Sequence, residues 1–334
     1  MFHKRNVSIL GALFALLPIF CSVSSVSGAP IVINFSHVVD DNTPKGQMAI
    51  KFKELVAERL KGKVVVKVFP KARLFGDEQL FEALLLDDVQ IGAPSLATFD
   101  KYTPKLQLFD LPFLFENIEA VDRFQKGPVG QALLSSFTER GILGLGYLHN
   151  GMKQFSAKKE LRVPEDAAGL KFRIQFSGVI SAQFKAMGAI PFPAPFGQTF
   201  ALLDTGVVDG QENTWSNIYS KKFHTVQPFI TESNHGVLDY MVITSVEFWE
   251  GLPEDIRSEV KKAIDEAIVF GNEKAQQQSV GDRKKIEDSK AAKILVLSKE
   301  ERQKWVEKMR PVWRDFEKVL GKDVIDNAYR SNAQ

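Results

Sequence analysis

Apolar and polar positions along the first third of the chain form a pattern that predicts a βαβαβ unit. Runs rich in Val, Ile and Phe predict strands at 31–37, 64–69 and 89–93, and a helix is expected at 76–85. Between the first two strands, apolar residues recur at the spacing of one helix face, at Met48, Phe52, Leu55, Val56 and Leu60. Strands that alternate with helices indicate a parallel sheet with helices packed on it, so the expected fold class is α/β.

A second unit of the same kind is expected to begin near residue 151, after an apolar strand at 142–149. Short apolar stretches predict its strands and helices, with strands at 153–157, 170–175, 189–193 and 207–210 and helices at 177–187 and 196–203. A long apolar strand at 236–245 is expected to cross back to the first unit. Two units in 334 residues agree with two domains of ordinary size.

The last third of the chain is dominated by helix-forming residues. A helix is expected to begin at Pro253, because Glu254 and Asp255 suit the positive end of a helix dipole. A further helix is expected at 299–320, with large apolar side chains at packing intervals. We expect these helices to brace the sheets and assign them no chemistry.

The start of the chain has the layout of a secretory signal peptide at 1–29. Lys4 and Arg5 precede an apolar run at 7–20, and small residues at 27–29 offer a cleavage site. The apolar run is too short to span a bilayer comfortably, and an uncleaved membrane anchor is the alternative interpretation. We therefore expect export to the periplasm.

The single cysteine of the chain, Cys21, lies within this leader. A lipid-attachment site requires a small residue before the cysteine, and Phe20 is large. We therefore expect cleavage without a covalent membrane anchor, and an exported chain that has neither disulfides nor thiol chemistry.

Charge and motifs exclude several classes of function. Removal of Lys4 and Arg5 from the 43 basic residues leaves as many as the 41 acidic ones, a balance that argues against a nucleic-acid partner. The five histidines form no metal-binding pair, and the chain has no phosphate loop, dinucleotide turn or serine-hydrolase elbow. These absences weigh against an enzyme and against any cofactor or metal, and we expect no catalytic residue.

The stretch from Gly169 to Asn217 contains the strongest candidate for a binding site. In the expected strand at 170–175, Phe172 and Ile174 face one side while Arg173 faces the other. A guanidinium held on a strand presents a rigid fork of donors that suits a carboxylate ligand. The alternative is that Arg173 is only a solvated strand residue.

Other polar residues follow the expected strands of both units, namely His37, Lys45, Ser95, Lys153 and Asn213. In open α/β sheets, ligands bind at the carboxyl ends of strands, and two such domains that face each other form a cleft. Each residue also has a local interpretation, as a turn residue, a solvated helix start or an N-cap.

Several segments together resemble one family, the extracytoplasmic solute-binding proteins of TRAP transporters and, within it, the four-carbon-dicarboxylate (DctP) branch. They are FSHVV (35–39), TPKG (43–46), APSLA (93–97), FDLPFLF (109–115), NGMK (150–153), LKFRIQ (170–175), VDGQEN (208–213), SNIY (216–219) and SNHG (233–236). No single segment is specific, but together they cover most of the exported chain.

The resemblance implies a two-lobed, periplasmic-binding-protein-like fold. It has cross-over strands, a long hinge helix, C-terminal helices that brace the lobes, and a ligand buried between the lobes. We expect lobe I to comprise residues 30–150 and about 237–275, and lobe II to comprise 151–236 and about 276–334.

The resemblance also implies roles for individual residues. Arg173 matches the arginine that binds the ligand carboxylate, and Asn213 matches the amide that supports it. Lys153 stands where binders of acidic sugars carry a second arginine, and Lys45 is expected to meet a second carboxylate from the other lobe, with His37 as the alternative. The remaining matches line the cleft and are Phe196, Glu78 and His235.

Three hypotheses follow. The first is a periplasmic receptor, a monomer in our expectation, that delivers malate, succinate or fumarate to membrane permease subunits. The second keeps the fold but binds a monocarboxylate such as a sugar acid or keto acid. The third is an exported enzyme that acts on a carboxylate with Glu78 or His235 as base.

Overall fold

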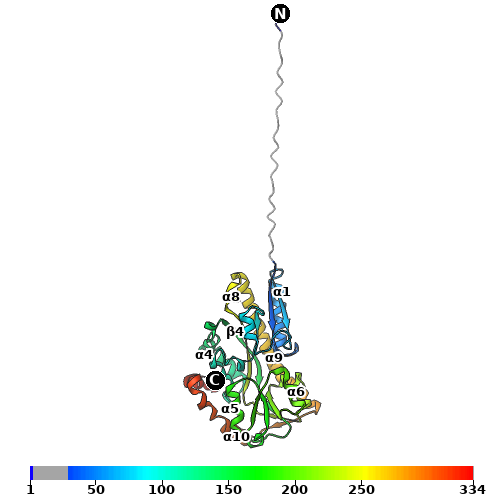
Figure 1. The fold of residues 1–334 in the computed structure, drawn as a ribbon, viewed down its shortest axis with the longest axis vertical. Coiled ribbons are helices and arrows are strands. Elements are labelled where there is room, and N and C mark those ends of the chain that lie inside the picture. Colours follow the sequence, from blue (N-terminus) through cyan, green and yellow to red (C-terminus); the bar gives the residue numbers. More distant parts are fainter. Residues whose placement is uncertain (3–28, 334) are drawn as a thin grey trace.

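The computed structural model describes residues 1–2 and 29–333 of the chain. The expected signal peptide lies almost entirely outside the described residues. Within the described ranges, no helix is both long enough and apolar enough to cross a membrane. The folded part consists of two lobes stacked along the long axis of the molecule, with helices α1 and α8 in one and α5, α6 and α10 in the other (Figure 1).

The first lobe is built on a five-stranded sheet in the order β2-β1-β3-β10-β4. β1 pairs in parallel with β2 and β3, as the βαβαβ pattern predicts, whereas β10 is antiparallel to β3 and β4. The elements are β1 (Ile31–Ser36), α1 (Pro44–Arg59), β2 (Val64–Phe69), α2 (Leu80–Leu85), β3 (Ile91–Gly92), α3 (Ile118–Lys126), α4 (Pro128–Leu134), β4 (Ile142–Met152), β10 (Val237–Ser245) and α8 (Val246–Gly251).

The second lobe has a six-stranded sheet in the order β11-β9-β5-β8-β6-β7. Its elements are β5 (Gln154–Ala157), β6 (Lys171–Ile174), α5 (Gly178–Ala186), β7 (Ile190–Pro193), α6 (Thr199–Asp204), β8 (Gly210–Asn213), α7 (Trp215–Ser220), β9 (Phe229–Glu232) and β11 (Lys293–Val296). The sequence pattern does not predict β9 and β11. Each has four residues, too few for periodicity to show, and each exists because a neighbouring strand pairs with it.

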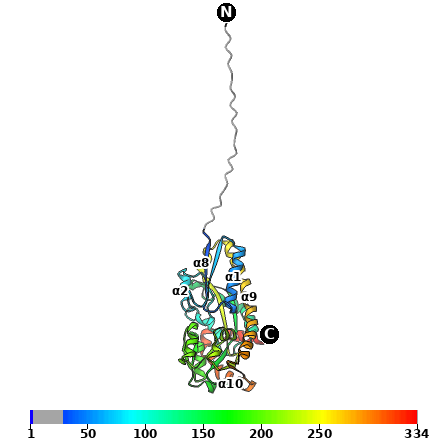
Figure 2. The ribbon, with the colours of Figure 1, turned by 90° about the vertical axis from the view of Figure 1, so that its right-hand side faces the viewer.

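The chain passes between the lobes at two neighbouring points. Only Lys153 separates β4 from β5, and Met152 is paired with Val237 at the start of β10, which returns from the second sheet. The helix α9 (Glu254–Ser289) packs on α1 and β4 of the first lobe and on α7 of the second, so it runs alongside both lobes (Figure 2). The cross-over strands and the long hinge helix of the two-lobed fold are therefore present.

The C-terminal helices divide between the lobes. The helix expected at 299–320 is interrupted at Pro311 and forms α10 (Lys299–Met309) and α11 (Val312–Leu320). Trp305 and Met309 of α10 pack in the core of the second lobe. Ile325 and Ala328 of α12 (Lys322–Arg330) instead join the core of the first lobe, although residues 276–334 were expected to belong to the second as a block.

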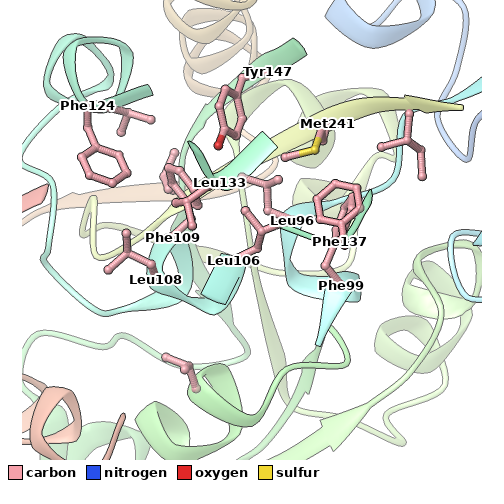
Figure 3. Close-up of a cluster of buried hydrophobic side chains, with 14 of the residues drawn as sticks. Leu96, Phe99, Leu106, Leu108, Phe109, Phe124, Leu133, Phe137, Tyr147 and Met241 are labelled. Carbon is pink, nitrogen blue, oxygen red and sulfur yellow. The ribbon is translucent and has the colours of Figure 1, made fainter. Parts of the chain in front are cut away.

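The largest apolar cluster fills the first lobe beneath β4 and β10. Figure 3 shows Leu96, Leu106 and Leu133 grouped between the rings of Phe109 and Phe137. These side chains are at most 5% exposed, so they provide a rigid base for the strand ends above them.

A buried histidine links the cross-over strands to two helices. His149 on β4 has Nδ1 2.7 Å from Oδ2 of Asp239 on β10 and Nε2 3.5 Å from Oδ1 of Asp122 on α3. Its backbone N–H donates to Oδ1 of Asn272 on α9 at 2.8 Å. Burial opposes the charged ring, but Asp239 and Asp122 outweigh it and raise the pKa of His149 from 6.5 to about 9.

The His149 contacts predict a loss of stability at alkaline pH. A pKa raised in the folded state adds stability that is complete below pH 6.5 and disappears as the pH rises through 9. We expect the free energy of unfolding to fall by on the order of 3 kcal/mol across this window. Chemical denaturation at several pH values measures it. His149→Gln should flatten the profile between these limits, and an identical profile in both proteins would contradict the assignment.

Candidate functional site

A cavity lies between the lobes and is lined by side chains from both. Its volume is about 20 Å³, close to the space that one water molecule needs, so a small organic ligand enters only if the surrounding side chains or lobes move apart. The first lobe contributes Val38, Val39, Asp77, Ser95, Leu238 and Tyr240, and the second contributes Arg173, Gln175, Phe196, Asn213 and Asn217. A larger groove between α3 and α9 is lined by none of the nine residues that the sequence singles out.

Arg173 is buried in the wall of this cavity. β6 places Phe172 and Ile174 in the apolar core and Arg173 on the opposite face, where it is 2% exposed. Its Nε and Nη2 atoms donate to the carbonyl of Ala194 at 2.9 and 2.6 Å. Nη1 donates to no residue within 29–333, so one arm of the fork remains for a ligand. The interpretation of Arg173 as a solvated residue is therefore wrong.

Burial disfavours the charged form of the Arg173 guanidinium, but the side chain stays charged at neutral pH. Burial lowers the pKa of the guanidinium to about 10, while Glu212, Glu78 and Asp77 oppose that decrease. A buried cation with incomplete hydrogen bonding gains most from an anion that arrives with its own acceptors.

Two asparagines flank Arg173 at the end of β8 and the start of α7. Oδ1 of Asn213 accepts from Nδ2 of Asn217 at 2.8 Å and from the backbone N–H of Thr214 at 3.2 Å. Because the oxygen is occupied, the amide nitrogen of Asn213 is the group that it can offer to a ligand. This supports a donor role toward a carboxylate.

The first lobe places a cation behind an aromatic ring. Lys45, 1% exposed in the first turn of α1, donates to the carbonyl of Ala93 at 2.8 Å, and its Nζ lies 3.6 Å from the centroid of the Tyr240 ring. Burial lowers the pKa of Lys45 to about 8, against the opposing effect of Asp77. Lys45 does not itself line the cavity, whereas Tyr240 does.

Tyr240 is a site residue that the sequence analysis does not single out. Its hydroxyl oxygen accepts from Nδ2 of Asn150 at 2.9 Å, so the hydroxyl hydrogen is the group that it can donate, to the neighbouring Asn217 or to a ligand. Burial raises the pKa of Tyr240, so this donor is retained at neutral pH. Alternation along the expected strand at 236–245 predicts that Tyr240 and Leu238 lie on one face of the strand. It does not predict that this face lines a ligand site.

Lys153 and His235 lie in a buried network that does not line the cavity. Nζ of Lys153 is 2.8 Å from Oε1 of Glu212, and Nε2 of His235 is 2.7 Å from Oε2 of the same carboxylate. The His235 ring stacks on Phe155 with centroids 3.7 Å apart. This arrangement corrects two expectations from the resemblance. The charge of Lys153 is already paired, and His235 is a structural partner of Glu212.

Glu212 holds this network together. Burial alone would raise the pKa of its carboxyl, but Lys153 and His235 outweigh burial and lower it to about 2. The three groups come from the cross-over point, from β8 and from the loop before β10. The network therefore ties the cross-over segments to the second sheet just behind Asn213.

The structure also corrects the expectation for Glu78. Glu78 is exposed and does not line the cavity, whereas its neighbour Asp77 is 8% exposed and does. No periodicity in the loop at 70–79 distinguishes two adjacent acids, so the sequence offers no signal for this choice. Oδ2 of Asp77 accepts from the backbone N–H of Ser95 at 3.3 Å.

Of the remaining expected residues, Ser95 and Phe196 line the cavity, whereas His37 does not. Ser95 lines the cavity while its Oγ also accepts from the Ala97 N–H at 3.4 Å, as the alternative N-cap interpretation predicts. Phe196 lines the cavity from the second lobe. His37 is 1% exposed beside Lys45, with neither ring nitrogen bonded to a described residue, and burial with Lys45 lowers its pKa to about 3.

Comparison with known proteins gives one consistent result. The family model for bacterial extracellular solute-binding protein, family 7 (DctP) matches residues 35–319. The C4-dicarboxylate-binding periplasmic protein DctP of Shewanella loihica is 59% identical over 304 residues, which are 91% of this chain and 90% of that protein.

Two solved structures of TRAP periplasmic solute binding proteins share the fold. The protein from Shewanella oneidensis, with bound succinate, matches with a TM-score of 0.90 and 58% sequence identity. The match covers 91% of this chain and 100% of that protein's chain. The protein from Pseudomonas aeruginosa, with bound L-malate, matches with a TM-score of 0.84 and 47% sequence identity. The match covers 86% of this chain and 100% of that protein's chain.

Proposed function

This chain belongs to family 7 of the bacterial extracellular solute-binding proteins, and from that premise we propose that it is the periplasmic receptor of a TRAP transporter for four-carbon dicarboxylates. It captures succinate, malate or fumarate between its lobes and delivers the ligand to membrane permease subunits. The relatives with bound succinate and malate support this ligand class.

The observation that carries the proposal is the buried, incompletely bonded guanidinium of Arg173 in the interlobe wall. A carboxylate removed from water is costly unless it is paired and hydrogen-bonded. In the proposed complex, Arg173 and the amide of Asn213 supply both the charge and the donors for one carboxylate.

The second carboxylate faces the first lobe. There it meets the hydroxyl of Tyr240, behind which the ammonium of Lys45 is held. Only a closed arrangement of the lobes brings both ends of the ligand to their partners at once. Ligand binding thus favours closure through differential affinity for the closed state.

Family membership also supports proposals about export, oligomeric state and the fate of the ligand. We propose export with removal of residues 1–29, action as a monomer, and no turnover of the ligand. The bound acid should be recovered unchanged after prolonged incubation with the protein. Chemical conversion of the acid would favour the exported-enzyme hypothesis instead.

A ligand screen tests the proposal directly. Thermal-shift measurements followed by calorimetry should show stabilisation by succinate, malate and fumarate, because binding to the native state alone raises its apparent stability. Sugar acids and keto acids with a single carboxylate should stabilise the protein much less. Preference for such monocarboxylates would reject the dicarboxylate assignment while leaving the receptor role intact.

Lys45→Gln should selectively weaken the binding of dianions. Loss of the ammonium behind Tyr240 is expected to cost on the order of 1–2 kcal/mol of succinate binding, the through-space attraction between opposite charges that do not touch. A monocarboxylate held by Arg173 should lose much less. Calorimetry with both ligands measures the difference, with the exposed Lys67→Gln of the same lobe as control. Equal losses for both ligands would count against a role for Lys45 at the second carboxylate.

A further inference from the structure

We propose that Asp77 takes up a proton when the cavity binds a dicarboxylate dianion, and that in the complex it donates this proton in a hydrogen bond to a carboxylate of the ligand. The inference rests on the proposed function and concerns a residue to which the resemblance assigns no role.

Asp77 places a carboxyl group in the wall of a cavity that we propose for an anion. Its side chain lines the cavity, and the residue is 8% exposed. Oδ2 accepts one hydrogen bond, from the backbone N–H of Ser95 at 3.3 Å. Within residues 29–333, no basic nitrogen lies within 4.0 Å of its carboxylate.

The two nearby cations are engaged elsewhere. Lys45 donates to the carbonyl of Ala93 and lies over the Tyr240 ring. Arg173 donates two hydrogen bonds to the carbonyl of Ala194. Asp77 therefore interacts with both cations only through space, and neither is committed to it.

A bound dianion changes the balance of charge. It brings two carboxylates into a cavity that already holds the carboxylate of Asp77, so that three negative charges face the two cations Lys45 and Arg173. Carboxylates that share a site cannot all remain ionised, and the least stabilised one takes a proton. Asp77, with one backbone N–H and no contacting cation, is the least stabilised of the three.

The groups that face Asp77 come from four parts of the chain. They are Lys45 on α1, Arg173 on β6, Tyr240 on β10 and the adjacent Glu78. Burial already raises the pKa of Asp77, while Lys45, the Ser95 N–H and Arg173 oppose that rise. A ligand that draws the two cations toward its own carboxylates removes part of this opposition and raises the pKa further.

The direction of the pH effect follows from linkage. Uptake of a proton on binding means that succinate affinity falls as the pH rises, by about tenfold per pH unit for one proton. The window lies between the pKa of Asp77 in the free protein and its higher pKa in the complex. Asn at position 77 has nearly the same shape and offers an N–H donor without titration, so it mimics the protonated acid.

Calorimetry measures the uptake. Succinate is titrated into the protein at pH 6.5 in buffers with different enthalpies of ionisation, and the slope of observed enthalpy against buffer enthalpy counts the protons. The wild-type protein should take up a large fraction of one proton. Asp77→Asn should take up almost none, and its affinity should be nearly constant between pH 6 and 7.5. Lys45, whose pKa is about 8, is protonated at this pH and contributes little.

His37 is the matched comparison, because it is a buried titratable group beside Lys45. His37→Asn, whatever its affinity, should keep the wild-type proton uptake. The proposal is overturned if the wild-type protein takes up no proton, if uptake persists in Asp77→Asn, or if uptake disappears in His37→Asn. Asp77→Ser replaces Asp77→Asn if the latter does not fold.

The outcome also separates this proposal from the one it rests on. If succinate, malate and fumarate all fail to bind the wild-type protein, the dicarboxylate assignment falls and the inference about Asp77 falls with it. If they bind without proton uptake, the receptor function stands and only the role of Asp77 is rejected.

Discussion

Arg173→Gln is expected to weaken succinate binding by about 2–5 kcal/mol, the cost of truncating one partner of a buried charge pair. This corresponds to an increase in Kd of roughly 30-fold to several thousand-fold. The effect is large because the remaining carboxylate would be buried opposite a neutral amide. In the structure, Nη1 of Arg173 is the uncommitted arm of the only guanidinium among the residues that line the cavity.

Arg173→Lys separates charge from geometry. Lysine keeps the positive charge but lacks the planar fork that can donate to Ala194 and to a ligand carboxylate at once. We expect it to recover only part of the lost affinity.

Calorimetry with succinate measures both variants, and Arg162→Gln serves as the control because Arg162 is paired on the surface of the same lobe. Circular dichroism and thermal unfolding check that the Ala194 carbonyl, left without its donors, has not disrupted the fold. Wild-type affinity in a folded Arg173→Gln variant would refute the site assignment.

Lys153→Met is expected to lower the free energy of unfolding by about 3–5 kcal/mol without removing any group from the cavity wall. Lys153 and Glu212 are both about 1% exposed in their side chains, and the variant leaves the carboxylate of Glu212 with His235 as its remaining side-chain partner. A buried charge that loses its counter-ion cannot regain water without opening the structure.

Urea denaturation without ligand measures this loss. The control is Lys293→Met, which breaks an exposed ion pair with Glu160 on the same lobe and should change the stability little, because solvent screens such a pair. Equal costs for the two variants would show that the buried network does not support the second lobe.

The same network should make the stability of the protein depend on pH in the acid range. A pKa of Glu212 that is lowered to about 2 in the folded state contributes stability that is present above 4.5, its ordinary value, and is lost as the pH falls toward 2. The wild-type protein should therefore lose more stability than Lys153→Met between these pH values.

The sequence by itself determined the elements whose pattern is local. Alternating Val, Ile and Phe residues predicted β1 and β2, and the helical spacing from Met48 to Leu60 predicted α1. Alternation also placed Arg173 opposite the core-facing Phe172 and Ile174. These predictions succeed because the side-chain period of a strand or helix is a property of a few consecutive residues.

The resemblance extended the prediction to the architecture, since periodicity shows neither cross-over strands nor the hinge role of α9. It also indicated Phe196 and Asn213, which the structure places in the cavity wall with Arg173 and with Ser95, a residue singled out by its place after a predicted strand. Their contact with a ligand remains a prediction for the experiments above.

Only the tertiary structure decided which polar groups are free and which are already paired. Lys153 has the same charge whether or not Glu212, 59 residues away in the sequence, lies beside it, but the pairing engages that charge away from the cavity wall. Tertiary packing also chose Asp77 over Glu78 for the cavity wall and placed α12 on the first lobe. The availability of a charge depends on partners that are distant along the chain, and local sequence patterns carry no information about them.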